Sequence, residues 1–414
     1  MRGSCSQAAE QLLTTGTQPS DAATPVVSAF YDRFPYPGDP VQDGPPPGYN
    51  WRWSYADVHS QCHGSAPKPR RPLRILDAGC GTGVSTDYLA HLNPGAEILA
   101  VDISAGTLEV ARERLRRSGA HEQATVRLEQ RSLLDLAGEG PFDLINSVGV
   151  LHHLDDPLAG LKALGPLLAP GALFHLFLYA DGGRWEIHRI QRALSLLGAA
   201  TDGDGLRLGR ALFEDLPADN RLRLRHEQRW AIDTAPDPNF ADMYLHPQET
   251  SYDLKRLWQF VEAAGLEFLG FSNPEQWDPA RLLKGELLER AQQLPERERW
   301  LLIESLDPEI SHLEFFVSNQ PIQRQVWHSD AELLAARPQR SVCLWGWPSA
   351  ALLNRDMAPL QLSPDQMLLL QAMEQPEAHG LSLAQLPLDW SEQQRCAVAR
   401  ELLAQAVLLL GEAD

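Results

Sequence analysis

Asp77-Ala-Gly79-Cys80-Gly81-Thr82-Gly83 is the stretch that decides the fold of this 414-residue chain. It follows a short apolar run, Leu73 to Asp77, which predicts a strand, and it leads into a helical stretch near Val84 to His91. The glycines allow a tight turn and let a ligand approach the backbone, with the amides at the helix start facing it. A nicotinamide dinucleotide fingerprint requires glycine where the chain has Val84, so a dehydrogenase is disfavoured.

Strands and helices alternate downstream of this loop. Apolar runs predict further strands at 97–101, 125–128, 142–145, 172–179, 266–271 and 312–317, and amphipathic stretches predict helices at 105–117, about 156–168 and 252–264. Such alternation is typical of an α/β protein. We therefore expect a Rossmann-like, seven-stranded, mostly parallel sheet with helices on both faces.

A second acidic residue, Asp102, ends the second predicted strand. Its carboxylate has two oxygens, which suits a ribose diol. With this acid in place, the chain resembles the class I S-adenosylmethionine-dependent methyltransferases, of the type 11/12-like kind found in bacteria. The resemblance rests on the glycine stretch, on Ala100 to Ser104, on Pro141 to Leu154 and on the turn Leu167 to Ala172.

The resemblance implies S-adenosylmethionine as the cofactor and assigns residues to it by position. It implies that three glycines (Gly79, Gly81 and Gly83) contact the methionine moiety, Asp102 the ribose and Ile103 the adenine ring. Ser132-Leu133 stands where the family often has an acid for the adenine amine, and Ala172 replaces a usual glycine. The remaining residues implied for the cofactor site are Asp77, Cys80, Ser132, Leu133 and Asn146.

Acceptor recognition is expected in two segments outside these motifs. They are the aromatic and proline-rich Phe30 to Pro37, placed to fold across the cofactor mouth, and the polar Asp242 to Tyr252. We select Tyr31, His153 and His246 as candidate catalytic residues, and His246 as the best base or orienting group because it is the one histidine in a polar segment. Plain packing is the alternative for both segments.

The run His152-His153-Leu-Asp155-Asp156 resembles a metal cluster. Adjacent histidines diverge on an extended or helical segment, so no metal is predicted. Methyl transfer from a sulfonium needs alignment more than acid–base help, and a general base is needed only if the acceptor arrives protonated.

Composition divides the chain into parts. We expect a flexible arm at 1–25, an extended aromatic and proline-rich cap and linker at 26–72, a methyltransferase domain at 73–320 with a lid insertion at about 184–250, and a small helical, winged-helix-like interaction domain at 330–414. The last helix is predicted to run to Leu410, with apolar positions that face either a core or a partner.

Charge limits the partners. The chain has 36 Lys and Arg against 55 Asp and Glu, a net charge of −19, which disfavours nucleic acid and anionic membranes. The C-terminal domain is also acidic, so a homodimer contact through it is preferred to DNA binding. Five scattered cysteines without a CxxC pair and the lack of a signal-like segment favour a cytoplasmic protein.

The leading function is methyl transfer to a small molecule or a protein side chain. Nucleic-acid methylation is disfavoured because Asn146-Ser147-Val148-Gly149 lacks the Asn/Asp-Pro-Pro-aromatic motif that grips a flipped base. The alternative is a catalytically silent regulatory or scaffold protein that binds S-adenosylmethionine. The acceptor atom stays open.

Overall fold

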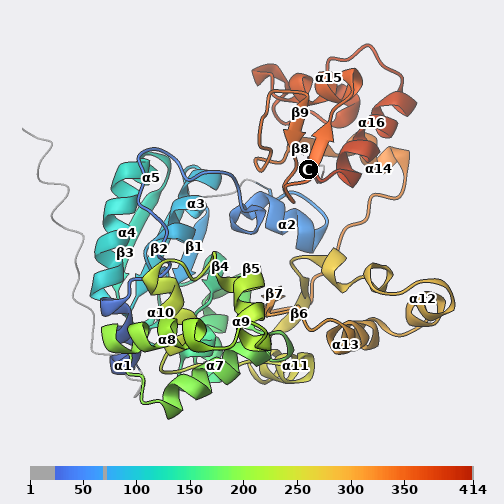
Figure 1. The fold of residues 1–414 in the computed structure, drawn as a ribbon. Coiled ribbons are helices and arrows are strands. Elements are labelled where there is room, and N and C mark those ends of the chain that lie inside the picture. Colours follow the sequence, from blue (N-terminus) through green and yellow to red (C-terminus); the bar gives the residue numbers. More distant parts are fainter. Residues whose placement is uncertain (1–23, 69–71, 413–414) are drawn as a thin grey trace, which may run out of the picture.

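The computed structural model describes residues 24–68 and 72–412, so most of the expected arm at 1–25 lies outside the described residues (Figure 1). A seven-stranded sheet forms the centre of the molecule. Its strand order is β3-β2-β1-β4-β5-β7-β6, and only β7 runs antiparallel to its neighbours, which confirms the predicted Rossmann-like fold. The strands are β1 (Arg74–Ala78), β2 (Glu97–Asp102), β3 (Thr125–Gln130), β4 (Phe142–Val148), β5 (Leu168–Tyr179), β6 (Glu267–Phe271) and β7 (His312–Ser318).

Helices cover both faces of this sheet (Figure 1). Because successive strand residues point to opposite faces, Ile75 joins one buried apolar cluster and Leu76 the other. The predicted helix at about 156–168 ends at Leu164, since Pro166 cannot continue it, and β5 therefore begins at Leu168. The helices around the sheet are α2 (Tyr55–His63), α3 (Val84–Leu92), α4 (Ala105–Ser118), α5 (Ala120–Gln123), α6 (Pro157–Leu164) and α11 (Leu254–Ala263), with 3₁₀ turns η2 (Leu133–Asp135), η3 (Leu151–His153) and η4 (Gly165–Leu167).

The segment before the sheet corrects one expectation. Residues 26–33 were expected to be extended, but they belong to helix α1 (Thr24–Arg33). The reason is that Pro25 sits in the first helical turn, where its missing N–H costs nothing, and the next proline, Pro35, lies beyond the end of the helix. Residues 34–50 contain no further helix or strand and lead to η1 (Trp51–Trp53).

A helical insertion follows β5 at the position of the expected lid. Its aromatic residues Phe213, Phe240 and Tyr244 form one buried cluster with Phe30 and Phe34 of the N-terminal segment. The insertion is therefore attached to α1. It consists of η5 (Gly182–Arg184), α7 (Trp185–Leu196), α8 (Gly203–Asp215), α9 (Arg221–Arg225), the π-helical turn η6 (His226–Trp230) and α10 (Asp237–Leu245).

A second helical excursion lies between β6 and β7 and projects from the body (Figure 1). Trp277 and Ile303 anchor its base in the main apolar cluster. Its elements are η7 (Pro274–Trp277), η8 (Pro279–Arg281), α12 (Gly285–Gln292) and α13 (Glu296–Leu306).

The C-terminal part has its own buried apolar core, and it corrects a second expectation. It is not only helical, and its last helix stops at Ala404 instead of reaching Leu410. Residues 408–411 are a strand, because four consecutive buried positions suit a strand covered on both sides. The elements are α14 (Asp330–Ala335), β8 (Arg337–Arg340), β9 (Ala351–Leu353), β10 (Pro359–Gln361), α15 (Pro364–Met373), η9 (Pro376–Ala378), η10 (Leu383–Gln385), α16 (Glu392–Ala404) and β11 (Leu408–Gly411).

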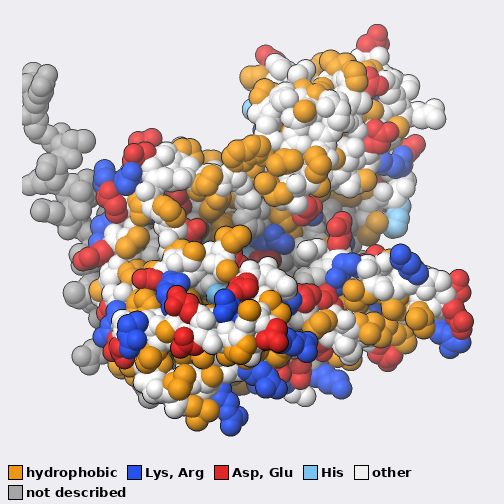
Figure 2. Space-filling model, viewed as in Figure 1, with side chains coloured by type: hydrophobic (Ala, Val, Ile, Leu, Met, Phe, Trp, Pro, Cys, Tyr) orange, Lys and Arg blue, Asp and Glu red, His pale blue; other side chains and the backbone are white. Residues whose placement is uncertain are grey.

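Charged and apolar side chains are mixed on the face of the molecule seen in Figure 2. Figure 2 shows basic and acidic side chains interspersed over the helices α7–α10 on the viewed face, without one dominant sign. Among the helices within residues 24–68 and 72–412, none combines the length and the apolar character needed to cross a bilayer.

Candidate cofactor and acceptor site

The glycine loop between β1 and α3 packs closely against segments that are distant in the chain. Gly79 has φ +87°, and a Cβ there would lie 2.4 Å from a methyl carbon of Val150. Gly81 has φ +51°, and its Cβ would lie 2.5 Å from the carbonyl oxygen of Tyr36. Only glycine tolerates both the backbone angle and the approach at these positions. The N-terminal segment therefore lies directly on the loop.

Asp102 is held rigidly at the end of β2. Its Oδ2 accepts the N–H of Gly81 at 2.8 Å, and its Oδ1 accepts the N–H of Ser104 at 2.9 Å. Burial raises the pKa of Asp102, and these two amide donations oppose that rise. Oδ1 also accepts the hydroxyl of Thr107 at 3.3 Å, so the free acceptor capacity of the carboxylate lies on Oδ2.

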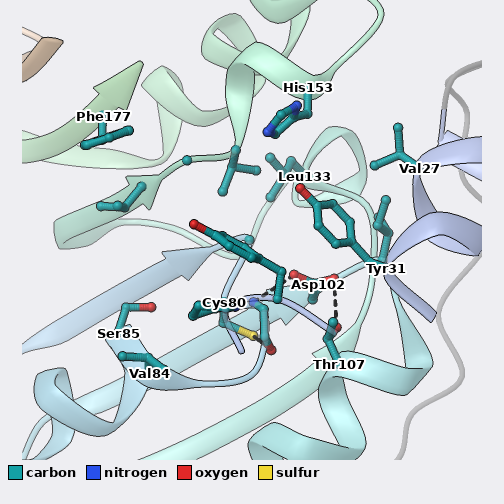
Figure 3. A pocket seen from close by; sticks show the side chains of 18 of the residues that line it. Val27, Tyr31, Cys80, Val84, Ser85, Asp102, Thr107, Leu133, His153 and Phe177 are labelled. Carbon is teal, nitrogen blue, oxygen red and sulfur yellow. Dashed lines mark hydrogen bonds between the residues drawn. The ribbon is translucent and has the colours of Figure 1, made fainter. Parts of the chain in front are cut away.

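A cavity of about 370 Å³ lies beside the carboxyl ends of β1, β2 and β4, where the strand order reverses. This is the place where open α/β sheets bind ligands. Figure 3 shows His153 and Phe177 across the cavity from Cys80 and Thr107. We call one side the loop wall (Gly79, Cys80, Gly81, Val84, Ser85, Asp102, Ile103 and Thr107) and the other the aromatic wall (Tyr31, Tyr36, His153, Phe177 and Tyr179).

Of the residues predicted for the cofactor, seven line the cavity: Gly79, Cys80, Gly81, Asp102, Ile103, Ser132 and Leu133. Asp77, Gly83 and Asn146 do not. Asp77 is buried behind the loop, where it accepts hydrogen bonds from Thr86 Oγ1 at 2.6 Å and from the side-chain amide of Asn146 at 2.8 Å. Gly83 packs its Cα side against Ala111 of α4. These three residues support the loop from behind.

The three candidate catalytic residues come together from distant parts of the sequence. The ring centroids of His153 and His246 lie 3.7 Å apart, and those of Tyr31 and His246 lie 5.4 Å apart. Tyr31 and His153 line the cavity, whereas His246 lies behind them and contacts Phe30 with a centroid distance of 4.9 Å. His246 thus takes second place to His153 as a group that faces the cavity.

Asp242, the first residue of the segment expected to recognise the acceptor but not one of the candidate catalytic residues, lies behind the aromatic wall. Tyr31 donates its hydroxyl to Oδ1 of Asp242 at 2.9 Å, and Tyr179 donates to Oδ2 at 3.3 Å. Burial raises the pKa of Asp242, opposed by the charge of His153 and the hydrogen bond from Tyr31. Burial also raises the pKa of Tyr31 well above its ordinary value, so both tyrosines stay protonated at neutral pH.

The end of the cavity next to Ser132 and Leu133 contains one residue that the motifs did not predict. Arg131 lines it and is paired with Glu139 at 2.6 Å, while the hydroxyl of Ser132 accepts the N–H of Leu134 at 3.3 Å. The position of Arg131 just after the third strand was the available signal, because ligands gather at strand ends.

Comparison with known families and sequences gives three findings. A family model described as a methyltransferase domain matches residues 76–174. The uncharacterized protein syc1184_c of Synechococcus sp. is 50% identical over 396 residues, which covers 94% of each chain. The uncharacterized phycocyanin operon protein W of Pseudanabaena tenuis is 51% identical over 102 residues, which covers 25% of this chain and 93% of that protein.

Among solved structures, PKMT2 from Rickettsia typhi in complex with AdoHcy has a similar fold. The TM-score is 0.56 at 18% sequence identity, and the similarity covers 89% of this chain and 77% of that chain. The likeness therefore extends well beyond the matched domain at 76–174.

Proposed function

Because the chain belongs to the class I S-adenosylmethionine-dependent methyltransferases, we propose that it transfers a methyl group to an acceptor held at the aromatic wall. The observation that carries this proposal is one cavity bounded by two unlike walls. The loop wall has the groups that hold the cofactor. The aromatic wall has hydroxyl and imidazole groups that face the same space.

The loop wall fits S-adenosylmethionine by its chemistry. The fixed carboxylate of Asp102 lines the cavity and suits a ribose hydroxyl as its next donor, and the apolar side chains of Ile103 and Leu133 suit the faces of adenine. The adenine amine is left to Ser132 and the main chain, since Asp102 is the one acidic side chain among the described residues that line the cavity. When bound, the cofactor supplies a methyl group already activated on a positively charged sulfur.

The aromatic wall contributes alignment and exclusion of water. Tyr31, Phe177 and Tyr179 present rings toward the cavity, and Asp242 fixes both tyrosine hydroxyls. Holding an acceptor in line with the reacting carbon supplies most of what a displacement reaction requires.

We further propose a protein as the acceptor, and phycocyanin subunits as the first protein to test. Two observations support this choice. One relative is named for the phycocyanin operon, and the chain adds the insertion at 182–245, the α12–α13 excursion and a C-terminal unit around the sheet. These additions supply surface of the kind that a macromolecular acceptor requires.

The test incubates purified protein and methyl-tritiated S-adenosylmethionine with phycocyanin, with other extract proteins and with the small-molecule fraction. We expect label in acid-precipitable protein that depends on the enzyme, and label confined to the small-molecule fraction would contradict a protein acceptor. Asp102→Ala should abolish the transfer, whereas Glu113→Ala, an exposed acid on α4, should not. Tight S-adenosylhomocysteine binding without transfer to any fraction would favour the silent binding protein.

A further inference from the structure

Two imidazoles are in close contact at the aromatic wall, where His153 lines the cavity and His246 lies behind it. His153 comes from η3 after β4, and His246 follows α10. Their planes are tilted by 33° with centroids 3.7 Å apart, and His153 is only 5% exposed. Two imidazoles in such contact cannot both be charged without strong repulsion.

The main chain of Gln248 binds both rings, through different groups. Its N–H donates to Nδ1 of His246 at 3.1 Å, and its carbonyl oxygen lies 2.7 Å from Nδ1 of His153. An amide N–H requires an acceptor nitrogen without a proton, so neutral His246 carries its proton on Nε2. A carbonyl oxygen requires a donor, so His153 carries a proton on Nδ1 and, when neutral, leaves Nε2 bare.

Burial keeps His246 in its neutral form. It lowers the pKa of His246 well below the ordinary value, and the charges of His153 and Arg184 act in the same direction. The Nε2 of His246 is buried and has no hydrogen-bond partner among the described residues. His246 is therefore a poor proton acceptor, which reverses the ranking expected from sequence.

The carboxylate of Asp242 lies close enough to His153 to balance a positive charge on its ring. One carboxylate oxygen of Asp242 and one nitrogen of each histidine lie within 4.8 Å of one another. Arg184 also acts on Asp242 and His246 by its charge, and it donates two hydrogen bonds to the carboxylate of Glu249, at 2.9 and 3.2 Å. His152, from the same turn as His153, is fully buried, and burial lowers its pKa well below the ordinary value.

We propose that Nε2 of His153 takes the proton of the methyl acceptor, and that Gln248 and His246 are positioning residues that set its tautomer. This inference rests on the proposed methyl transfer. The acceptor atom bonds to the methyl carbon as the carbon–sulfur bond breaks, the sulfur keeps that electron pair, and the acceptor's proton passes to Nε2. The acceptor is therefore a neutral O–H, S–H or N–H group that must lose its proton, not an anion.

Two histidines and a carboxylate are also a combination of donors that could hold a divalent metal ion. A metal ligand needs a bare nitrogen aimed at the ion. In His246 one nitrogen accepts the N–H of Gln248 and the other carries the proton, so the tautomers favour proton transfer over metal binding. Metal binding is a distinct outcome of the experiment below.

The decisive experiment is ¹⁵N NMR of histidine-labelled full-length protein with saturating S-adenosylhomocysteine at neutral pH. His153→Asn and His246→Asn assign the two rings, and His121→Asn, an exposed site, controls for general effects. We expect a bare Nε2 and protonated Nδ1 in His153, and the opposite in His246. The same tautomer in both rings, or stoichiometric Zn²⁺ or Co²⁺ that shifts both rings, would overturn the proposal.

A second variant separates positioning from packing. His246→Phe keeps an aromatic ring but removes the nitrogen that accepts the N–H of Gln248. Because Gln248 is then held less firmly, its carbonyl oxygen should no longer fix the proton on Nδ1 of His153, and His153 should change from one tautomer to a mixture. Labelled transfer into extract protein should fall about 100-fold in His153→Asn, the usual size of a general-base contribution, with S-adenosylhomocysteine affinity unchanged within about twofold. Unchanged transfer by His153→Asn would show that His153 is not the base. If the wild type does not bind S-adenosylhomocysteine, the proposed function itself is contradicted.

Discussion

Asp102 is the residue on which cofactor binding depends most directly. Charge-assisted hydrogen bonds contribute about 1.5–3 kcal/mol each, so Asp102→Ala should weaken S-adenosylhomocysteine binding by at least about 10-fold in calorimetry. Asp102→Asn keeps one acceptor oxygen, so its affinity for S-adenosylhomocysteine should lie between those of the wild type and of Asp102→Ala. Affinity within about twofold of wild type in the alanine variant would show that the ribose is held elsewhere.

Residue by residue, the motifs predicted the loop wall better than the aromatic wall. Gly79, Gly81 and Asp102 line the cavity because a strand-to-helix turn has few alternative shapes. The roles of Asp242 and Gln248 were not predicted because they depend on partners more than 60 residues away in the chain. These partners are Tyr31 and Tyr179 for Asp242, and His153 for Gln248. Their segment was expected to matter, but no local pattern distinguishes a carboxylate behind two tyrosines.

At the scale of elements, the N-terminal segment and the glycine loop act as one unit. Thr82 donates its N–H to the carbonyl of Tyr36 at 3.0 Å and its hydroxyl to that of Pro37 at 2.8 Å. Asp32 of α1 accepts hydrogen bonds from the hydroxyl of Ser104 at 2.7 Å and from the N–H of Gly106 at 3.0 Å. Cofactor binding and closure of this segment should therefore be coupled.

Gly81→Ala tests this coupling. The added methyl group meets the Tyr36 carbonyl, so we expect faster amide hydrogen exchange over residues 34–40 and weaker S-adenosylhomocysteine binding. Gly95→Ala is the matched control, because Gly95 also has a positive φ, +80°, but no atom within 4 Å of the added carbon. Equal exchange in both variants would refute the coupling.

Strands β5 and β7 are joined by a buried polar pair that should make stability depend on pH. Burial opposes ionisation of Glu314, but the hydrogen bond and charge of His175, with Arg52, outweigh it and lower the pKa to about 2. Because the native pKa lies below the ordinary 4.5, the stabilisation is full above pH 4.5 and disappears as pH falls toward 2.

Glu314→Gln should remove this dependence. We expect the variant to be less stable than wild type by about 3 kcal/mol at pH 7, and the difference to shrink steadily as pH falls from about 5 toward 3. Urea unfolding at a series of pH values measures it. A difference that is constant with pH would mean that the Glu314 carboxylate does not carry the effect.

The errors of prediction at this scale have simple causes. Pro25 permits a helix that a proline-rich composition seemed to forbid, and the apolar residues 407–410 suit a strand as well as a helix end. The position of Pro25 in the first helical turn decided the first case. The second was decided by the pairing of β11 with β8, which lies 68 residues or more earlier in the chain. Composition carries neither kind of information.

At the scale of the whole molecule, the C-terminal unit packs on helix α2 and η1. Asp57, fully buried, accepts the hydroxyl of Ser341 at 2.6 Å, and Arg355 lies over the ring of Trp51 at 4.4 Å while it bonds Gln61 at 2.6 Å. The apolar face of α16 points into the unit's own core, so the homodimer expected from sequence stays a prediction.

Ser341→Ala should lower the free energy of unfolding by about 1–3 kcal/mol, because it removes a donor from a buried carboxylate. S-adenosylhomocysteine affinity should not change, since neither Ser341 nor Asp57 lines the cavity. Chemical denaturation and calorimetry check the two parts, and Ser305→Ala, exposed on α13, is the control. A loss of affinity in Ser341→Ala would indicate that the C-terminal unit shapes the cavity.

The central claim is that one cavity brings a methyl donor and an acceptor together. The most direct measurement is the stoichiometry of products: S-adenosylhomocysteine formed, against methyl label gained by phycocyanin or another extract protein. The account predicts one S-adenosylhomocysteine for each methyl group transferred, with both lost in Asp102→Ala. Tight S-adenosylhomocysteine binding with no product above background from any extract fraction would contradict it.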